Sequence, residues 1–537
     1  MAARAAGALR RSRSYFCNLA PFRIDSRKGA LNALNFKRFY CDKVLPPLTT
    51  PLDVAKNDFT NAGQVIIPAR GGGRGEVKIT TLSNGLKVAS EDSFGQFCTI
   101  GALIDAGSRY EVDYPSGVSH MLEKMAFQST DNFASHDEIV HKMESLGGHV
   151  DCQSFKDCII YAASAFKYNT GEVIDVLCDS IWRANMTEDE IEEQKMTIGF
   201  ELESLDYRPD FEPQLTDLIH AAAFNGNSLG MPKYCPPENI SVLNSNILKH
   251  YLQRYYTPNR ITIAGVNVDH NELVKHCNMQ FVDKQPSWLS QAHVEPDCSI
   301  AQYTGGFVKE HRKEPRLQPG ITQFPELVHI AVGFESAKYT DPDMFSFAVL
   351  NMLLGGGGSF SAGGPGKGMY SRLYTNVLNR RHWMYSSTAY NFSYADSGLF
   401  CIQSSAPPNE ADAVVKVITK EFMNLVTEPF HEIEVARAKK QAQSMLMMNL
   451  ESRIVRFEDI GRQVLGLGFR HSPQNLYDSL ESVTADDLRR VSEKMLSTKP
   501  AVAAIGNLTH LPSYKEVEKN LTKSNASFGR YLFGSMK

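Results

Sequence analysis

The sequence predicts an α+β protein made of two homologous domains of about 220 residues, each a mostly antiparallel sheet packed with helices. Three observations support this prediction. At 537 residues, the chain is several times longer than a typical single domain. Within residues 76–282, strand patterns precede helix patterns. A helix–turn–strand segment near the end of that range recurs about 240 residues later, which indicates duplication.

The first domain is predicted to begin near residue 76 with a β-hairpin. Asn84-Gly85 separates two β-prone segments, which favours a type I′ turn, and residues 99–105 have the pattern of a third, buried strand. Helices follow at about 116–127, 136–146, 172–183 and 187–206, and a capping box between Thr187 and Glu190 opens the last of them. A helix over 246–256 and a strand over 260–265 complete the domain.

The second domain repeats part of this pattern. Residues 485–496 are predicted to be helical, Lys499-Pro500 forms a turn, and residues 501–506 form a strand that ends in glycine. A strand over 329–334, followed by a helix from about residue 341, matches the early strand of the first domain. We therefore divide the folded chain into a first domain (76–282), a Pro-rich polar linker (283–325) and a second domain (326–537).

Residues 1–40 have the composition of a mitochondrial transit peptide. They contain nine arginines and lysines against one acid, Asp25, a net charge of +8, and no long apolar segment. Cleavage after Tyr40 would make Cys41 the first residue. The whole chain has a net charge of −4, so removing a segment of charge +8 would leave a net charge of −12. Residues 41–75 are expected to be an irregular extension. The acidic chain that remains favours basic binding partners and argues against nucleic acid as a partner. No apolar segment of the sequence is long enough to span a bilayer.

A degenerate metal motif lies on the helix predicted over 116–127. His120, Glu123 and Lys124 nearly match H-x-x-E-H, in which two histidines one helical turn apart bind Zn²⁺ and the glutamate acts as general base. Lysine stands in place of the second histidine, and a protonated lysine has no lone pair to offer a metal. We therefore expect neither a metal nor catalytic residues in this chain. The ten cysteines include no C-x-x-C pair and are expected to be reduced.

A glycine-rich segment follows an apolar helix pattern that ends at Leu354. It does not match the P-loop pattern G-x-x-x-x-G-K-[ST]. That pattern would require glycine at position 361, which is serine, and serine or threonine at position 368, which is glycine. A chain with so few side chains exposes its backbone N–H and C=O groups, which suits the binding of an extended peptide. An inert linker is the alternative, although the apolar Phe360, Met369 and Tyr370 argue against it.

Together, these features resemble the inverted-zinc-motif (pitrilysin-like) metallopeptidases, over essentially the whole chain from about residue 60. In that family a glutamate about 77 residues after the motif is the third zinc ligand, and here the position is Glu201. The supporting glutamate seven residues earlier is replaced by Gln194. We expect Lys124 to substitute for the positive charge of the metal and to pair with Glu201, which would keep this part of the core neutral.

The resemblance also implies a function. The chain is expected to be the non-catalytic subunit of a heterodimer in the mitochondrial matrix, either free or associated with the inner membrane. A zinc-bearing beta subunit would cleave basic amphipathic presequences that this chain binds and presents. The residues that the resemblance assigns to substrate binding are Gly355, Gly356, Gly357, Gly358, Ser359, Phe360, Gly363, Gly364, Gly366, Lys367 and Gly368.

Two alternatives stay open. The family also contains the structural core subunits of respiratory complex III, which would need no peptide-guiding loop. A self-sufficient peptidase would need other ligands, for instance His136, His141 or His149. The first two of these histidines are five positions apart, about 140° around a helix, so they do not face one ion.

Overall fold

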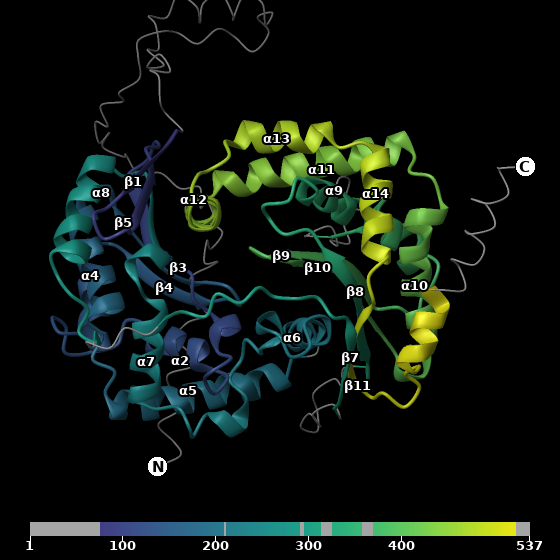
Figure 1. Cartoon of the computed structure of the whole chain (residues 1–537), viewed down its shortest axis with the longest axis horizontal. Helices are drawn as coiled ribbons and strands as arrows, with labels where there is room; N and C mark the ends of the chain where they lie inside the picture. Colours follow the sequence, from purple (N-terminus) through teal and green to yellow (C-terminus); the bar gives the residue numbers. More distant parts are fainter. Residues whose placement is uncertain (1–75, 209–210, 290–294, 313–324, 357–368, 522–537) are drawn as a thin grey trace, which may run out of the picture. The chain divides into compact units, whose positions relative to one another are not determined.

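The computed structural model describes residues 76–208, 211–289, 295–312, 325–356 and 369–521, and its strands form two sheets (Figure 1). The first sheet has the order β1-β2-β6-β3-β5-β4. Neighbouring strands are antiparallel except β2 and β6, which are parallel. The strands are β1 (Val77–Thr81), β2 (Lys87–Glu91), β3 (Phe97–Ile104), β4 (His149–Ser154), β5 (Ile159–Phe166) and β6 (Ile261–Val266).

The second sheet repeats the arrangement of the first. Its order is β7-β11-β8-β10-β9, and β7 and β11 are parallel, as β2 and β6 are. The two strands predicted to end the two repeats, β6 and β11, take equivalent places. The strands are β7 (Gly306–His311), β8 (Val328–Ser336), β9 (Ser386–Ser393), β10 (Gly398–Ala406) and β11 (Ala501–Gly506). The predicted α+β fold with a repeated, mostly antiparallel sheet is thus confirmed.

The hairpin between β1 and β2 is present, but its turn differs from the prediction. The Gly85 N–H donates to the Leu82 carbonyl (3.0 Å), and the Leu82 N–H donates to the Leu86 carbonyl (2.8 Å). Gly85 has a φ of 93°, whereas Asn84 has no positive φ. This is a three-residue loop with a glycine bulge instead of a type I′ turn, which would need positive φ at both central residues.

Part of the predicted linker is a strand. β7 lies within residues 283–325, the predicted linker, and pairs with β11, so Gly306–His311 belongs to the second sheet and not to a linker. The charges of Lys309 and Glu310 indicated a solvated segment. They are equally compatible with a strand at the edge of a sheet, where charged side chains reach solvent.

Helices cover the sheets, and the structure confirms those predicted in the first domain. α4 and α8 pack on the first sheet, and α10 and α14 pack on the second (Figure 1). In the part of the chain that the structure describes, no helix is long and apolar enough to cross a membrane. The α-helices are α2 (Val118–Met125), α3 (His136–Ser145), α4 (Thr170–Trp182), α5 (Glu188–Asp206), α6 (Glu212–Ala223), α7 (Ser245–Tyr255), α8 (His270–Cys277), α9 (Met344–Leu354), α10 (Ala411–Thr427), α11 (Glu432–Glu451), α12 (Arg453–Leu467), α13 (Pro473–Ser482) and α14 (Ala485–Leu496).

Two helices pack on the sheet of the other half of the chain. α6 contacts β7, β8 and β11, and its Leu215 and Ile219 are buried against the second sheet. In the same way, α12 contacts β2, β3 and β6, and Phe457 is buried against the first sheet. Gly461 of α12 allows this close approach, because a Cβ there would overlap Leu103 of β3. This exchange buries apolar residues of both halves in shared clusters.

Candidate functional site

Helix α2 carries the degenerate metal motif, and a buried carboxylate fixes its first turn. Gly117, at the N-cap, provides no side chain. Instead, Glu111 accepts hydrogen bonds from the N–H groups of Gly117 (2.6 Å) and Ser119 (2.7 Å), and from the Ser119 hydroxyl. These bonds satisfy free N–H groups at the start of the helix. Burial raises the pKa of Glu111 to about 7, although the hydrogen bonds from Ser119 and Gly117 oppose this shift. The sequence pattern did not identify Glu111, because this residue lies outside the helix that it caps.

The four residues predicted to mark the lost metal site do come together. Lys124 Nζ lies 2.7 Å from Glu201 Oε2 and 2.9 Å from Glu123 Oε1. His120 Nε2 lies 3.2 Å from the same Glu201 oxygen. Helices α2 and α5 therefore bring positions 120, 124 and 201 to one point, as zinc ligands would converge, and the ammonium group of Lys124 takes part in that convergence. The ion pair expected between Lys124 and Glu201 is present.

The hydrogen bonds of this cluster favour the charged forms of its carboxylates and of its lysine. Hydrogen bonds from His120 and then Lys124 lower the pKa of Glu201 to about 2, against the effect of partial burial. For Glu123, burial raises the pKa, but hydrogen bonds from Ser154 and Lys124 outweigh it and the pKa is lowered overall. Burial lowers the pKa of Lys124, but its bonds to Glu201 and Glu123 raise it overall. Two carboxylates thus share the ammonium group of Lys124, and Glu201 also accepts a hydrogen bond from His120.

Glu123 is not free to act as a base. One of its oxygens is bound to Lys124, and the other accepts hydrogen bonds from the Ser154 N–H (2.8 Å) and hydroxyl (2.7 Å). A general base must accept a proton from a water or substrate within hydrogen-bonding reach. Both oxygens of this carboxylate already have partners within the chain. Ser154 follows Glu123 by 31 residues and has no local signal that would have identified it.

The tautomer of His120 also disfavours a metal. The Cys235 backbone N–H donates to His120 Nδ1 (3.2 Å), so Nδ1 must have its lone pair free. In the neutral ring the proton then sits on Nε2, which donates it to Glu201. A zinc-binding histidine has the opposite pattern: its ligand nitrogen is unprotonated and its other nitrogen donates to an acceptor. The backbone of Cys235 therefore holds His120 in the tautomer that does not bind zinc through Nε2.

The residues present do not fit a zinc ion. Position 124 supplies a cation, and His120 presents an N–H. Over the described ranges, the structure contains no group of three or more histidine, cysteine, aspartate and glutamate side chains arranged to hold a metal. His136 is bound through Nδ1 to the Phe127 carbonyl (2.9 Å), and His141 is exposed beside Glu144. The alternative histidine ligands therefore form no such group.

Restoring the missing histidine is not expected to restore tight zinc binding. In Lys124→His, zinc at His120 Nε2 would move the ring proton to Nδ1, where it would face the Cys235 N–H. Losing a supporting hydrogen bond commonly lowers metal affinity about 10–100-fold. In this variant the Nδ1–H of His120 and the N–H of Cys235 would also point at each other, and neither could accept the other's proton. We expect Lys124→His to bind zinc at least about 100-fold more weakly than a peptidase of the family that carries the intact H-x-x-E-H motif, measured by competition with a chelator. Equal affinities would refute the tautomer assigned to His120.

The start of the glycine-rich segment is fixed to the second sheet. Gly355 ends α9 with a φ of 126°, a conformation that glycine tolerates. Gly355 and Gly356 both donate their N–H groups to the Asn351 carbonyl (2.9 and 2.8 Å), and the Ala389 N–H of β9 donates to the Gly355 carbonyl (3.3 Å). Of the predicted substrate-binding residues, only Gly355 and Gly356 are described. The others lie outside the described residues: Gly357, Gly358, Ser359, Phe360, Gly363, Gly364, Gly366, Lys367 and Gly368.

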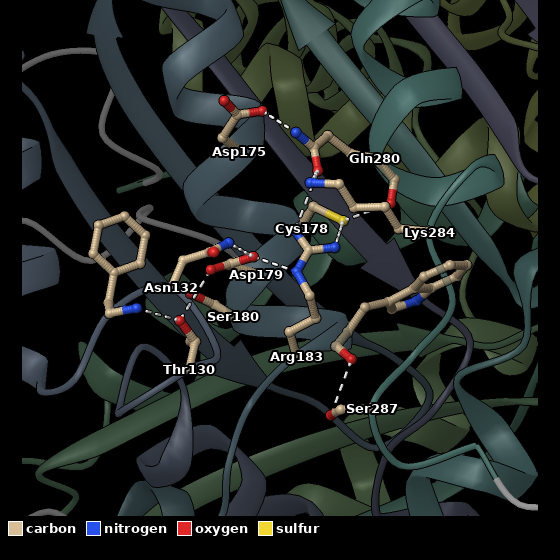
Figure 2. Close-up of polar contacts among 12 residues, drawn as sticks. Thr130, Asn132, Asp175, Cys178, Asp179, Ser180, Arg183, Gln280, Lys284 and Ser287 are labelled. Carbon is tan, nitrogen blue, oxygen red and sulfur yellow. Dashed lines mark hydrogen bonds and ion pairs between the residues drawn. The ribbon is translucent and has the colours of Figure 1, made fainter.

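A second polar cluster, centred on Asp179 of α4, was not predicted (Figure 2). The buried Asp179 carboxylate accepts hydrogen bonds from Thr130 Oγ1 (3.0 Å) and Asn132 Nδ2 (2.8 Å), and it forms an ion pair with Arg183. Arg183 also donates to Gln280 Oε1 (3.2 Å). Each charged group has buried partners, and the cluster ties α4 to two other segments of the first domain. We assign it a structural role.

Comparisons with known proteins agree with these observations. A family model described as insulinase (peptidase family M16) matches residues 87–237, and one described as the peptidase M16 inactive domain matches residues 243–442. The chain is similar to proteins named mitochondrial-processing peptidase subunit alpha. It is 48% identical to that of Pongo abelii over 92% of this chain and 93% of the relative. It is 40% identical to that of Caenorhabditis elegans, over 85% of this chain and 89% of the relative. It is 34% identical to that of Solanum tuberosum, over 87% of this chain and 89% of the relative.

Proposed function

This chain belongs to the insulinase (M16) family of peptidases, and from that premise we propose that it is the non-catalytic, substrate-binding subunit of a heterodimeric mitochondrial processing peptidase. In this proposal it binds the presequences of imported precursors and presents them to a zinc-bearing beta subunit. The chain itself needs no cofactor. It acts in the mitochondrial matrix after removal of residues 1–40.

The position of Lys124 is the observation that carries this proposal. In an active site of this family, position 124 would provide a ligand, but here an ammonium group bonds to both Glu123 and Glu201. Peptide hydrolysis by a zinc enzyme needs three protein ligands and a bound water. A chain that keeps the fold but replaces a ligand with a cation is suited to binding a substrate and leaves hydrolysis to a partner.

The glycine-rich segment supports substrate binding. It leaves α9 at Gly355 and Gly356, next to β9, which is the last strand in the order of the second sheet. Gly355 and Gly356 pair with Ala389 on the outer side of this strand. Elsewhere along an edge strand, backbone groups can pair with an extended peptide. An acidic chain also attracts basic presequences at long range.

The proposal predicts that cleavage requires both chains. The purified chain, its zinc-bearing partner and their mixture would each be incubated with a fluorescent basic presequence peptide, and product would be measured by chromatography. We expect cleavage at full rate only in the mixture. A chelator should abolish that activity, because the zinc belongs to the partner. Zinc-dependent cleavage by this chain alone would refute a non-catalytic role.

A further inference from the structure

The outward face of α5 combines large apolar and acidic side chains. Met196, Phe200 and Tyr207 are 61%, 71% and 56% exposed, although side chains of this size usually pack in a core. They are four and seven positions apart, so they lie on one side of the helix. The buried side of α5 is formed separately, by Ile191, Gln194, Ile198 and Leu205. The three exposed residues are therefore additional to the core of the domain.

Acidic residues share this face. At 100° per residue, Asp189, Glu193 and Glu203 fall on the same side of the helix as Met196 and Phe200. All three acids are exposed, and within the described residues none has a basic partner within ion-pair distance. The neighbouring acids do have partners: Glu192 pairs with Lys195 (2.7 Å), and Asp206 pairs with Arg312. We call Asp189, Glu193, Met196, Phe200, Glu203 and Tyr207 the α5 outer face.

We propose that the α5 outer face binds the basic amphipathic helix of a presequence, a proposal that rests on the proposed function. The apolar side of such a helix would pack on Met196, Phe200 and Tyr207, and its arginines would reach the unpaired acids. The face spans 19 residues from Asp189 to Tyr207, and the 18 steps between its ends correspond to about 27 Å, or about five turns of a peptide helix. A second copy of this chain would place acid against acid, so charge complementarity selects the basic peptide.

This surface is distinct from the degenerate metal site. Glu201, which bonds to Lys124 and His120, is on α5 but turned about 100° from Phe200, towards α2. The α5 outer face is also separate in sequence from the glycine-rich segment. It would therefore hold the helical part of a presequence, while the edge of the second sheet offers backbone pairing to an extended part.

Binding of three synthetic 18-residue peptides to the full chain tests the proposal by fluorescence anisotropy. The first has four arginines and one apolar face, the second is a scrambled version with no apolar face, and the third has glutamine for arginine. We expect the first to bind most tightly. Met196→Ser with Phe200→Ser should weaken its binding about tenfold or more, because apolar contact area is lost. Glu193→Gln with Glu203→Gln should weaken it about fivefold at low salt and less at high salt.

Matched variants elsewhere on the chain serve as controls. Ile433→Ser removes an apolar side chain that is 86% exposed on α11, and Asp486→Asn removes an exposed acid on α14. Neither should change binding, and all variants should keep the thermal unfolding midpoint of the unchanged chain. Binding by the unchanged chain together with normal binding by both α5 variants would overturn the α5 proposal alone. Absence of any binding, with or without the zinc-bearing partner, would overturn the proposed function as well. If the α5 variants bind peptide normally but no longer assemble with the partner, the face is a subunit interface instead.

Discussion

Replacing Asp179 with alanine is expected to lower the free energy of unfolding by about 3–5 kcal/mol, because it leaves a buried cation without its counterion. The side chains of Asp179 and Arg183 are only 1% and 8% exposed. Without the carboxylate, Thr130 and Asn132 also lose their shared acceptor. The loss should appear in urea unfolding followed by tryptophan fluorescence, since Trp182 is buried next to Arg183.

An exposed ion pair provides the control for this prediction. Asp412 and Lys416 are paired on α10 with side chains that are 47% and 60% exposed. Asp412→Ala should cost no more than about 1 kcal/mol. Replacing Asp179 and Arg183 together with leucine and methionine should cost less than Asp179→Ala alone, because no unpaired charge stays buried. If Asp179→Ala lowers the free energy of unfolding as little as Asp412→Ala does, the cluster in Figure 2 contributes no more to stability than an exposed ion pair.

Deleting residues 357–368 is expected to lower the kcat/KM of the two-chain enzyme for a basic presequence peptide by about tenfold or more, mainly through a higher KM. The proposed function places substrate binding in this segment and hydrolysis in the partner. Gly355 and Gly356 are kept in this variant, because they end α9 and bond to Asn351 and to β9. The deletion is therefore designed to affect peptide binding without disturbing the second sheet.

Gly356→Ala separates binding from stability. A Cβ at position 356 would overlap the Asn351 side chain, so this variant should unfold at a lower temperature. The deletion should keep its unfolding midpoint and lose activity. If the deletion leaves kcat/KM unchanged, the segment does not guide substrate, and a structural role like that of the complex III core subunits becomes the better explanation.

The sequence was sufficient where a signal is local or strictly periodic. The capping box of Thr187 and Glu190 fixed the start of α5, and the repeated helix–turn–strand pattern identified β6 and β11 as equivalent strands. The spacing of His120 and Lys124 placed both on one face of a helix, and the resemblance to the inverted-zinc-motif peptidases predicted that Glu201 joins them. Such signals depend on helical geometry and on hydrogen bonds between residues close in sequence, so the sequence carries them directly.

The tertiary structure decided features that depend on residues far apart in the chain. Cys235 sets the tautomer of His120, Ser154 occupies an oxygen of Glu123, and Glu111 caps α2 from outside it. None of these partners has a spacing that would mark it, because the fold alone brings their segments together. By itself, the sequence determined that a ligand was missing and which family the fold resembles. Only the packing of distant segments determined that the remaining histidine and glutamate are also held in states unsuited to zinc chemistry, since hydrogen-bond partners fix tautomers and charges.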